Sequence, residues 1–168
     1  SLPSVPEAVE LFYAINKIGA VFCGMDCRSK HDEIEEILVQ IKPKACFVSD
    51  FHLKEFTNVD SVPVICISFM KTISVIASFA SVFVGIFTGR TFLIARRKNF
   101  MSYQQFIRNA KDTPVEKTDL GGDEICAYFY TSGTTYGRKC VMITNENMNS
   151  SVLQYAYSQP GIDGADRF

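Results

Sequence analysis

The chain has 168 residues, a formal net charge of −1 and a hydrophobic content of 47%, with 14 Phe and 7 Tyr. This length is enough for one ordinary domain with a real core and too short for two large ones. Because the net charge is close to zero, there is no overall field to attract nucleic acid, and the composition argues against a nucleic-acid partner.

The cysteines and histidines form no pattern that is typical of a metal or catalytic site. His31 and His52 lie next to expected helix caps and are predicted to face water, without a catalytic role. The cysteines lack the paired spacing of a zinc finger, and we interpret them as reduced core thiols of a cytosolic protein. They are Cys23, Cys27, Cys46, Cys66, Cys126 and Cys140.

Two amphipathic helices are predicted near the start of the chain. Pro6 suits the first turn of a helix, which Gly19 ends. Ser29 and Asp32 resemble a capping box at the start of a second helix, which Pro43 ends. Both segments carry apolar residues at helical spacing, so each helix is expected to bury one face.

Short apolar runs alternate with these helices. Asp50 is expected to cap a further short helix through Leu53 and Phe56. The runs predict three strands, at residues 20–23, 45–48 and 62–67. They lack polar alternation, as is expected when both faces of a sheet are covered. This order predicts an α/β fold with a layered, largely parallel sheet and helical crossovers.

Residues 72–89 carry no charge and are flanked by basic residues, including Arg96, Arg97 and Lys98. Eighteen residues lie at the lower threshold for a membrane-spanning helix, but hydroxyl residues and two glycines weaken that interpretation. A buried helix, or one lying on a membrane surface through 72–98, explains the same residues. The chain is accordingly divided into an α/β segment (1–70), an apolar insertion-like segment (71–98) and a loop-bearing segment (99–168).

The last segment alternates between helices and strands. A short helix is predicted from Phe100 through Ile107, and Lys111–Asp123 is expected to be a surface connection. Strands are predicted over Ile125–Tyr130 and Cys140–Ile143, followed by a helix that Thr144 or Asn145 caps.

The stretch Thr131–Lys139 connects these two strands and is the part of the sequence best suited to a ligand. Its hydroxyls, its glycines and its closely spaced backbone N–H groups suit a polyphosphate, and the hydroxyls are also available to Mg²⁺. Lys139 adds a positive charge. A strand follows, so the Walker pattern is excluded. A Ser/Thr/Gly-rich hairpin loop without a ligand remains the alternative.

The run Tyr130-Thr131-Ser132-Gly133-Thr134-Thr135, with Lys139 and Val141, resembles the signature loop of the adenylate-forming superfamily. That superfamily includes acyl-CoA synthetases, adenylation domains of peptide synthetases and luciferases. Its pattern reads Tyr-Thr-Ser-Gly-Thr-Thr-Gly-x-Pro-Lys-Gly-Val, then two residues, then Ser/Thr-His. Less specific similarities begin at Pro6-Glu7-Ala8-Val9 and continue through Gly19-Ala20-Val21. The chain departs from the loop pattern at Tyr136, Arg138, Cys140 and Asn145.

This resemblance implies an N-terminal fragment of an ATP-dependent, AMP-forming ligase that activates a carboxylate and passes it to a coenzyme A or carrier-protein thiol. In such enzymes the loop holds the β- and γ-phosphates of Mg²⁺-bound ATP. The residues implied in phosphate binding are Thr131, Ser132, Gly133, Thr134, Thr135 and Lys139. The family's adenine, ribose and magnesium motifs lie downstream, so these 168 residues are not expected to catalyse the reaction alone.

Two other functions stay open at this point. The chain could be a non-catalytic nucleotide- or phosphate-binding remnant, or a small membrane-associated protein organised around residues 72–89. The ligase interpretation implies a cytoplasmic protein of fatty acid metabolism, with membrane association through 72–98 as the alternative.

Overall fold

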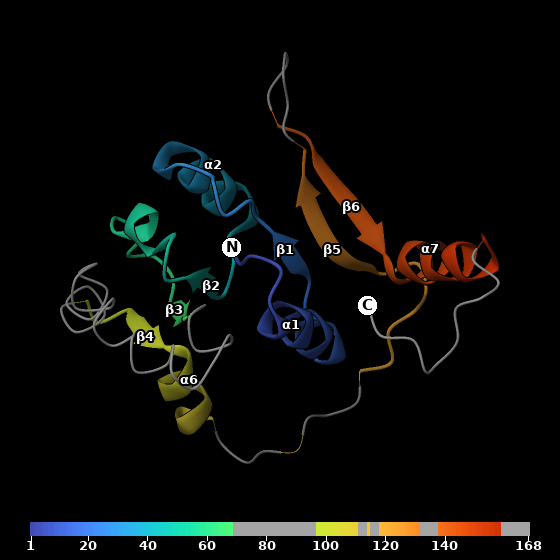
Figure 1. The fold of residues 1–168 in the computed structure, drawn as a ribbon, viewed down its shortest axis with the longest axis horizontal. Coiled ribbons are helices and arrows are strands. Elements are labelled where there is room, and N and C mark those ends of the chain that lie inside the picture. Colours follow the sequence, from blue (N-terminus) through green and yellow to red (C-terminus); the bar gives the residue numbers. More distant parts are fainter. Residues whose placement is uncertain (69–96, 111–113, 115–117, 132–137, 159–168) are drawn as a thin grey trace. The chain divides into compact units, whose positions relative to one another are not determined.

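The computed structural model describes residues 1–68, 97–110, 114, 118–131 and 138–158. The chain folds as two compact units that are interleaved along the sequence. Unit 1 comprises Ser1–Leu11 and Met25–Pro114, and unit 2 comprises Phe12–Gly24 and Val115–Phe168. Figure 1 labels the helices and strands of both units.

Unit 1 contains a parallel sheet with the strand order β2-β3-β4. The strands are β2 (Cys46–Ser49), β3 (Val64–Ile67) and β4 (Phe100–Ser102). Both pairs are parallel, and β3 lies in the centre with all four residues buried. Because both faces of β3 are covered, its residues do not alternate between polar and apolar, and all four are apolar.

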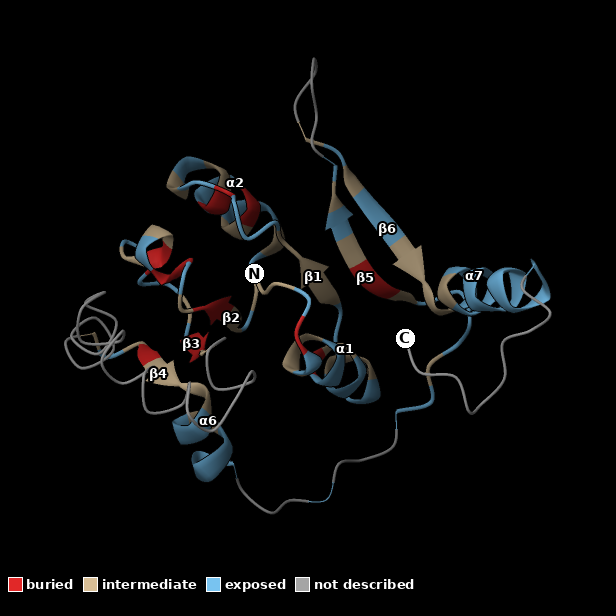
Figure 2. Ribbon diagram, in the orientation of Figure 1, coloured by how far each residue is buried: buried red, intermediate tan, exposed pale blue. Residues whose placement is uncertain are grey.

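The core of unit 1 lies between this sheet and the residues of α2 (His31–Ile41) and η1 (Leu53–Phe56). Figure 2 shows buried residues in α2, in β2 and β3, and around η1. The fully or nearly fully buried cluster consists of Ile34, Val48, Leu53, Phe56, Val59, Val64, Cys66 and Phe100. The predicted α/β class and the parallel pairing of this part are therefore confirmed.

The predicted starts of two helices in unit 1 are wrong. Ser29 does not cap α2; it is 3% exposed, and the residue before the helix is Lys30, whose N–H donates to the Glu33 carboxylate at 3.0 Å. Asp50 does not cap η1 either, because His52 holds that position and the Asp50 carboxylate accepts from the Ser68 hydroxyl. In both places the residue that local spacing assigned to a cap has a tertiary contact, through the backbone carbonyl in Ser29 and through the side chain in Asp50.

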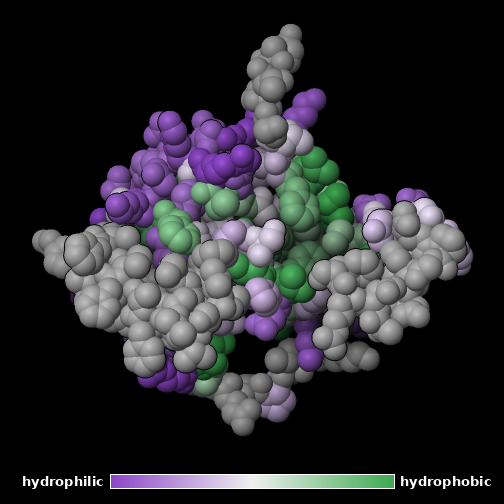
Figure 3. Space-filling model, in the orientation of Figure 1, coloured by the Kyte–Doolittle hydropathy of each residue, from purple (hydrophilic) through white to green (hydrophobic). Residues whose placement is uncertain are grey.

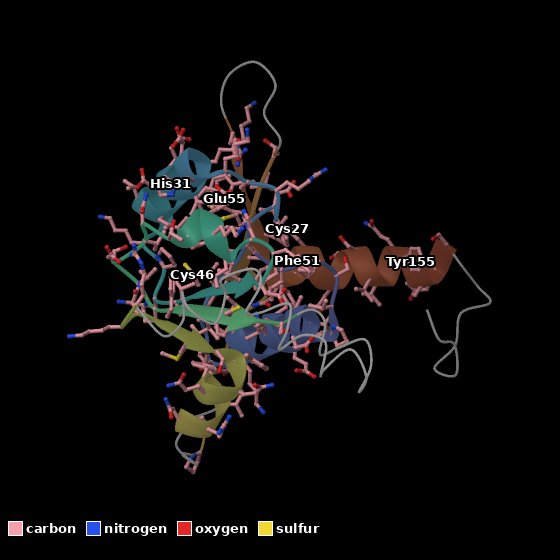
Figure 4. The ribbon with its side chains drawn as sticks, turned by 60° about the vertical axis from the view of Figure 1, so that its left-hand side comes forward. Cys27, His31, Cys46, Phe51, Glu55 and Tyr155 are labelled. Atoms are coloured by element: carbon pink, nitrogen blue, oxygen red, sulfur yellow. The ribbon has the colours of Figure 1, made fainter. Side chains whose placement is uncertain are left out.

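His31 and His52 were predicted to face water, and this prediction is wrong for both. His52 is 4% exposed; its Nε2–H donates to the Ser29 carbonyl, and its Nδ1 lies 2.6 Å from the Ser1 hydroxyl. His31 is partly buried, with Nε2 3.2 Å from the Glu35 carboxylate and Nδ1 3.0 Å from the Glu55 carbonyl. Figure 4 shows His31 and Glu55 close to one another. A buried imidazole is tolerated because both nitrogens have partners.

The segment after Asn99 begins with a strand and not with a helix. Phe100 is 5% exposed in β4, and helix α6 (Tyr103–Asn109) starts only after Ser102, whose hydroxyl accepts from the Gln105 N–H. Tyr103 and Phe106, which are expected core residues, are partly buried, and their rings are stacked. Pairing with β3 converts the first three residues from a helical to an extended conformation.

Cys46 gives a pH-dependent prediction for unit 1. Burial raises the pKa of its thiol to about 11, from an unfolded value near 9.0. Between these values the Cys46 thiol loses its proton in the unfolded state first. The free energy of unfolding should therefore fall as the pH rises from 9 towards 11, and this group should not affect it below pH 9.

The same burial should protect Cys46 from alkylation. Iodoacetamide at about pH 8, below the pKa of an ordinary thiol, should label exposed Cys27 and spare Cys46, as read by mass spectrometry. Equal labelling of the two thiols would contradict the prediction.

Unit 2 contains a mixed sheet with the order β1-β5-β6. Its strands are β1 (Phe22–Gly24), β5 (Ile125–Tyr130) and β6 (Cys140–Thr144). β1 pairs with β5 in parallel, while β5 and β6 are antiparallel because they are the two arms of one hairpin. Within the described residues there are thus two three-stranded sheets, and three of the four strand pairs are parallel, in agreement with the predicted largely parallel arrangement.

One face of this sheet packs against aromatic rings. Phe12 of α1 (Pro6–Lys17) lies with its ring centroid 5.4 Å from that of Phe22, and Phe22 contacts Phe129 at 6.3 Å. A Cβ added to Gly24 would lie 2.7 Å from the Phe129 ring, so a larger residue here would force that ring to move. The predicted strand 20–23 therefore begins two residues later and includes Gly24.

Helix α7 (Asn145–Ser158) follows β6 directly, and Thr144 caps it as predicted. The Thr144 hydroxyl accepts from the Asn147 N–H at 3.2 Å, while the Asn147 side chain accepts from the Thr144 N–H at 3.1 Å. This reciprocal pair is a capping box with an amide in the third position. Val152 in this helix is 65% exposed.

Replacing Thr144 by alanine should destabilise unit 2 by about 1 kcal/mol, because the Asn147 N–H loses its acceptor. The change in the free energy of unfolding is measured by urea unfolding, with the hydrogen exchange of the α7 amides as the readout. Ser151→Ala is the matched control: it removes an exposed hydroxyl that only donates back to a helix carbonyl, and should change stability by less than about 0.5 kcal/mol. Equal effects of the two substitutions would contradict the capping role.

The apolar segment 72–98 is largely outside the described residues, which resume at Arg97. Arg97 forms an ion pair with Asp60 at 2.7 Å. Among the residues that the structure describes, no helix has the length and apolar character needed to cross a membrane. The division into 1–70, 71–98 and 99–168 stays a prediction.

Candidate functional site

The antiparallel hairpin β5–β6 positions the predicted phosphate-binding loop. Aromatic and β-branched residues favour extended backbone in both arms. The strands pair from Ile125 with Thr144 to Tyr130 with Cys140, with an irregularity between Ile125 and Ala127. The pair Tyr130 and Cys140 ends the ladder, so the predicted loop is flanked by the paired ends of β5 and β6 (Figure 1).

Thr131 and Lys139 meet just beyond the last strand pair and form what we call the loop neck. The Thr131 N–H donates to the Lys139 carbonyl at 2.9 Å. The Lys139 N–H donates to the Thr131 hydroxyl oxygen at 3.2 Å. Both residues are exposed. The neck therefore holds the two ends of the loop together while leaving the Lys139 ammonium group in solvent.

A side-chain pair supports the neck from the sheet side. Burial, together with the neighbouring thiol of Cys140 and a hydrogen bond to it, raises the pKa of Tyr130 to about 12. Tyr130 thus stays a neutral phenol at physiological pH and does not cancel the charge of Lys139. Figure 3 shows hydrophobic surface over β5 and β6 on the face in view.

The structure brings together two of the predicted phosphate-binding residues, Thr131 and Lys139. The other four, Ser132, Gly133, Thr134 and Thr135, lie in the stretch 132–137, outside the described residues. The sequence predicted the position of the loop between two strands. It did not predict the hydrogen bond from the Lys139 N–H to the Thr131 hydroxyl, because spacing along the chain carries no signal for a contact that depends on hairpin register.

Asn145 has a structural role that sequence reasoning missed. Its side-chain oxygen accepts from the Asn16 side chain at 3.0 Å, and its amide nitrogen lies 3.4 Å from the Gly121 carbonyl. Its backbone N–H donates to the Glu124 carbonyl. Asn145 therefore ties the start of α7 to α1 and to the Gly121–Glu124 turn.

The described residues contain no other strong candidate for a site. No group of three or more His, Cys, Asp or Glu side chains among them could hold a metal ion. Five of the described cysteines are buried or partly buried, in line with the prediction of core thiols, but Cys27 is exposed. Figure 4 labels Cys27, which lies in the turn between β1 and α2, and Cys46, which lies in β2.

The fold is that of a known class of proteins. A family model described as AMP-binding enzyme matches residues 1–168, the whole chain. The chain therefore belongs to the AMP-binding enzyme family, and the resemblance drawn from the signature loop is confirmed. A comparison with curated protein sequences gives no match.

Solved structures agree with this membership at the level of fold. An acyl-CoA synthetase from Brucella canis has a TM-score of 0.64 at 16% identity, over 98% of this chain and 26% of its own. The luciferase-like enzyme from the nonluminescent mealworm Zophobas morio has a TM-score of 0.59 at 16% identity, over 97% of this chain and 33% of its own. A mutant form of coronafacic acid ligase from Pectobacterium brasiliense has a TM-score of 0.58 at 16% identity, over 88% of this chain and 24% of its own.

The coverage of these matches defines which part of the fold is present. The chain spans 24–33% of the length of the three structures. Its α/β architecture corresponds to the N-terminal portion of adenylate-forming enzymes. The activity of a complete family member is therefore only proposed for this chain.

Proposed function

We propose that this chain supplies the phosphate-binding part of an AMP-forming ligase that activates a carboxylic acid. The observation that carries the proposal is the loop neck. It fixes the two ends of a Ser/Thr/Gly-rich loop and places an exposed lysine at its far end. Family membership over the whole chain supports the same reaction class.

In the proposed reaction, the carboxylate oxygen attacks the α-phosphorus of ATP, which gives an acyl-adenylate and releases pyrophosphate. A thiol of coenzyme A or of a carrier protein then attacks the acyl carbon and releases AMP. Thr131, Ser132, Gly133, Thr134 and Thr135 would surround the β- and γ-phosphates, and Lys139 would balance their charge. Such donors act by positioning and by electrostatic stabilisation of the charge that develops on the leaving group.

Magnesium would enter with the nucleotide. The described residues offer no set of His, Cys, Asp or Glu that fits a metal ion. The Thr131 hydroxyl already accepts a hydrogen bond from the Lys139 N–H. Mg²⁺ prefers carboxylates and phosphate oxygens with near-octahedral geometry. We therefore assign Mg²⁺ to the ATP phosphates and derive no step from these residues acting on it.

Catalysis would require residues beyond those of this chain, which spans only 24–33% of its structural neighbours. The carboxylic acid and the thiol are then substrates of a longer polypeptide. In the cytoplasmic ligase that we propose, the hairpin loop contributes to the first step and to pyrophosphate release.

The proposal is tested by titrating the isotopically labelled chain with Mg·ATP, Mg·pyrophosphate and AMP. The NMR amide signals of Thr131 and Lys139 report binding in each titration. We expect saturable shifts with Mg·ATP and Mg·pyrophosphate, and no comparable shift with AMP, which lacks the β- and γ-phosphates. If neither polyphosphate moves these signals, the loop binds no ligand and is only a hairpin connection.

A further inference from the structure

We propose that Thr131 is a positioning residue for Lys139, and that its main contribution to binding is made through its hydroxyl on the lysine backbone. This inference rests on the proposed function of the loop, and it specifies how one of the loop's residues works. It follows from the geometry of the neck, where both partners are described and both lie outside the regular strand ladder.

The neck departs from ordinary antiparallel pairing in one bond. In a hydrogen-bonded pair of an antiparallel sheet, each residue donates its N–H to the carbonyl of the other. The Thr131 N–H follows this rule and donates to the Lys139 carbonyl at 2.9 Å. The Lys139 N–H instead donates to the Thr131 side-chain oxygen at 3.2 Å. A side chain with a γ-oxygen is therefore needed here, and threonine or serine supplies it while isosteric valine does not.

This bond determines the backbone position from which the Lys139 side chain projects. Lys139 is exposed, so little packing restricts it, and a lysine side chain loses much conformational freedom when it is held against an anion. Two hydrogen bonds at its backbone order the main chain of Lys139 before the ligand arrives, so that only the side chain remains to be ordered on binding. Below it, the pair Tyr130 and Cys140 fixes the strand register. The Thr131 hydroxyl thus prepares the lysine for binding.

The hydroxyl oxygen is already engaged as an acceptor by the Lys139 N–H. If Thr131 acted mainly on phosphate, its loss would weaken binding whether or not Lys139 carried its ammonium group. If Thr131 acts by positioning Lys139, its loss should matter only while that ammonium group is present. The two roles therefore differ in how their effects combine.

The first test needs no ligand. Amide hydrogen exchange at Lys139 is compared in the unmodified chain and in its Thr131→Val and Thr131→Ser variants. We expect Thr131→Val to speed the exchange of this amide about fivefold, the size of effect for one ordinary hydrogen bond, and Thr131→Ser to leave it nearly unchanged. The exchange of the Cys126 amide within β5 serves as the control for global stability. Unchanged exchange at Lys139 in the valine variant would overturn the proposal.

The second test is a double-mutant cycle on the affinity for Mg·ATP. Thr131→Val should weaken binding about fivefold, and Thr131→Ser should restore it. In a Lys139→Ala background, Thr131→Val should change the affinity less than about twofold, because the group it positions is gone. Equal losses in both backgrounds would overturn the positioning role in favour of direct phosphate contact.

The outcomes separate this inference from the proposed function. If Mg·ATP and Mg·pyrophosphate do not bind the unmodified chain, the proposed function fails, whereas the exchange result at Lys139 still reports whether the hydroxyl bond exists. If the polyphosphates bind and the cycle shows no coupling, the loop function stands and the positioning role of Thr131 is wrong.

Discussion

Replacing Phe56 by alanine is expected to destabilise unit 1 severely. Phe56 is 1% exposed in the core cluster of unit 1, and its ring meets His52 edge-on at a centroid distance of 5.5 Å. Removing a buried phenylalanine costs about 3–5 kcal/mol through lost transfer energy and the remaining cavity. Since whole domains are stable by only about 5–15 kcal/mol, this loss removes a large share of the stability, and unit 1 should unfold at a markedly lower urea concentration.

Phe51→Ala is the matched control for this prediction. Phe51 belongs to the same unit and is 65% exposed, and its position is labelled in Figure 4. Its replacement should change stability by only about 0.5 kcal/mol. Urea unfolding followed by circular dichroism distinguishes the two. If both variants lose the same free energy of unfolding, the cluster around Phe56 is not the core that the structure describes.

Replacing Lys139 by alanine is expected to have the largest effect on function. A charge-assisted hydrogen bond contributes about 1.5–3 kcal/mol, and each 1.4 kcal/mol is about a tenfold change in affinity. Mg·ATP and Mg·pyrophosphate should therefore bind roughly tenfold to a hundredfold more weakly, as measured by the same NMR titration. Binding of AMP should not change, because the lysine is proposed to act on the β- and γ-phosphates.

Lys17→Ala controls for the loss of one positive charge. Lys17 is an exposed residue at the end of α1, in the same unit as the loop neck. A long-range effect of net charge would weaken polyphosphate binding in both variants and would be screened by salt. A specific role for Lys139 predicts a loss in that variant alone. An equal loss for AMP in the Lys139 variant would argue against a position near the β- and γ-phosphates.

Segments whose structure depends on local residues were predicted well. The strand Ile125–Tyr130 has the predicted bounds, because its run of aromatic and β-branched residues is of the types enriched in strands. Pro6 begins α1, and Gly19 follows its end with φ of 71°, a conformation that glycine adopts without strain. Thr144 caps α7 through a contact only three residues away.

Segments that depend on distant partners were predicted less well. Ser29 and Asp50 have the residue types of helix caps, but the Ser29 carbonyl accepts from His52 and the Asp50 carboxylate accepts from Ser68. Phe100 fits a helical pattern, yet it pairs with the distant Val64 and becomes part of a strand. Such contacts depend on which segments meet in the folded chain, and a periodic pattern in one segment does not contain that information.

The candidate site divides in the same way. The sequence by itself determined the family, the α/β class and the place of the loop between two strands, because these depend on residue types in short runs. Only the tertiary structure decided that the two sheets are separate within the described residues and that Thr131 holds Lys139 through its side chain. The physical reason is register: hairpin pairing brings residues that are eight positions apart within hydrogen-bond distance, and that pairing is determined by the whole sheet and not by the loop alone.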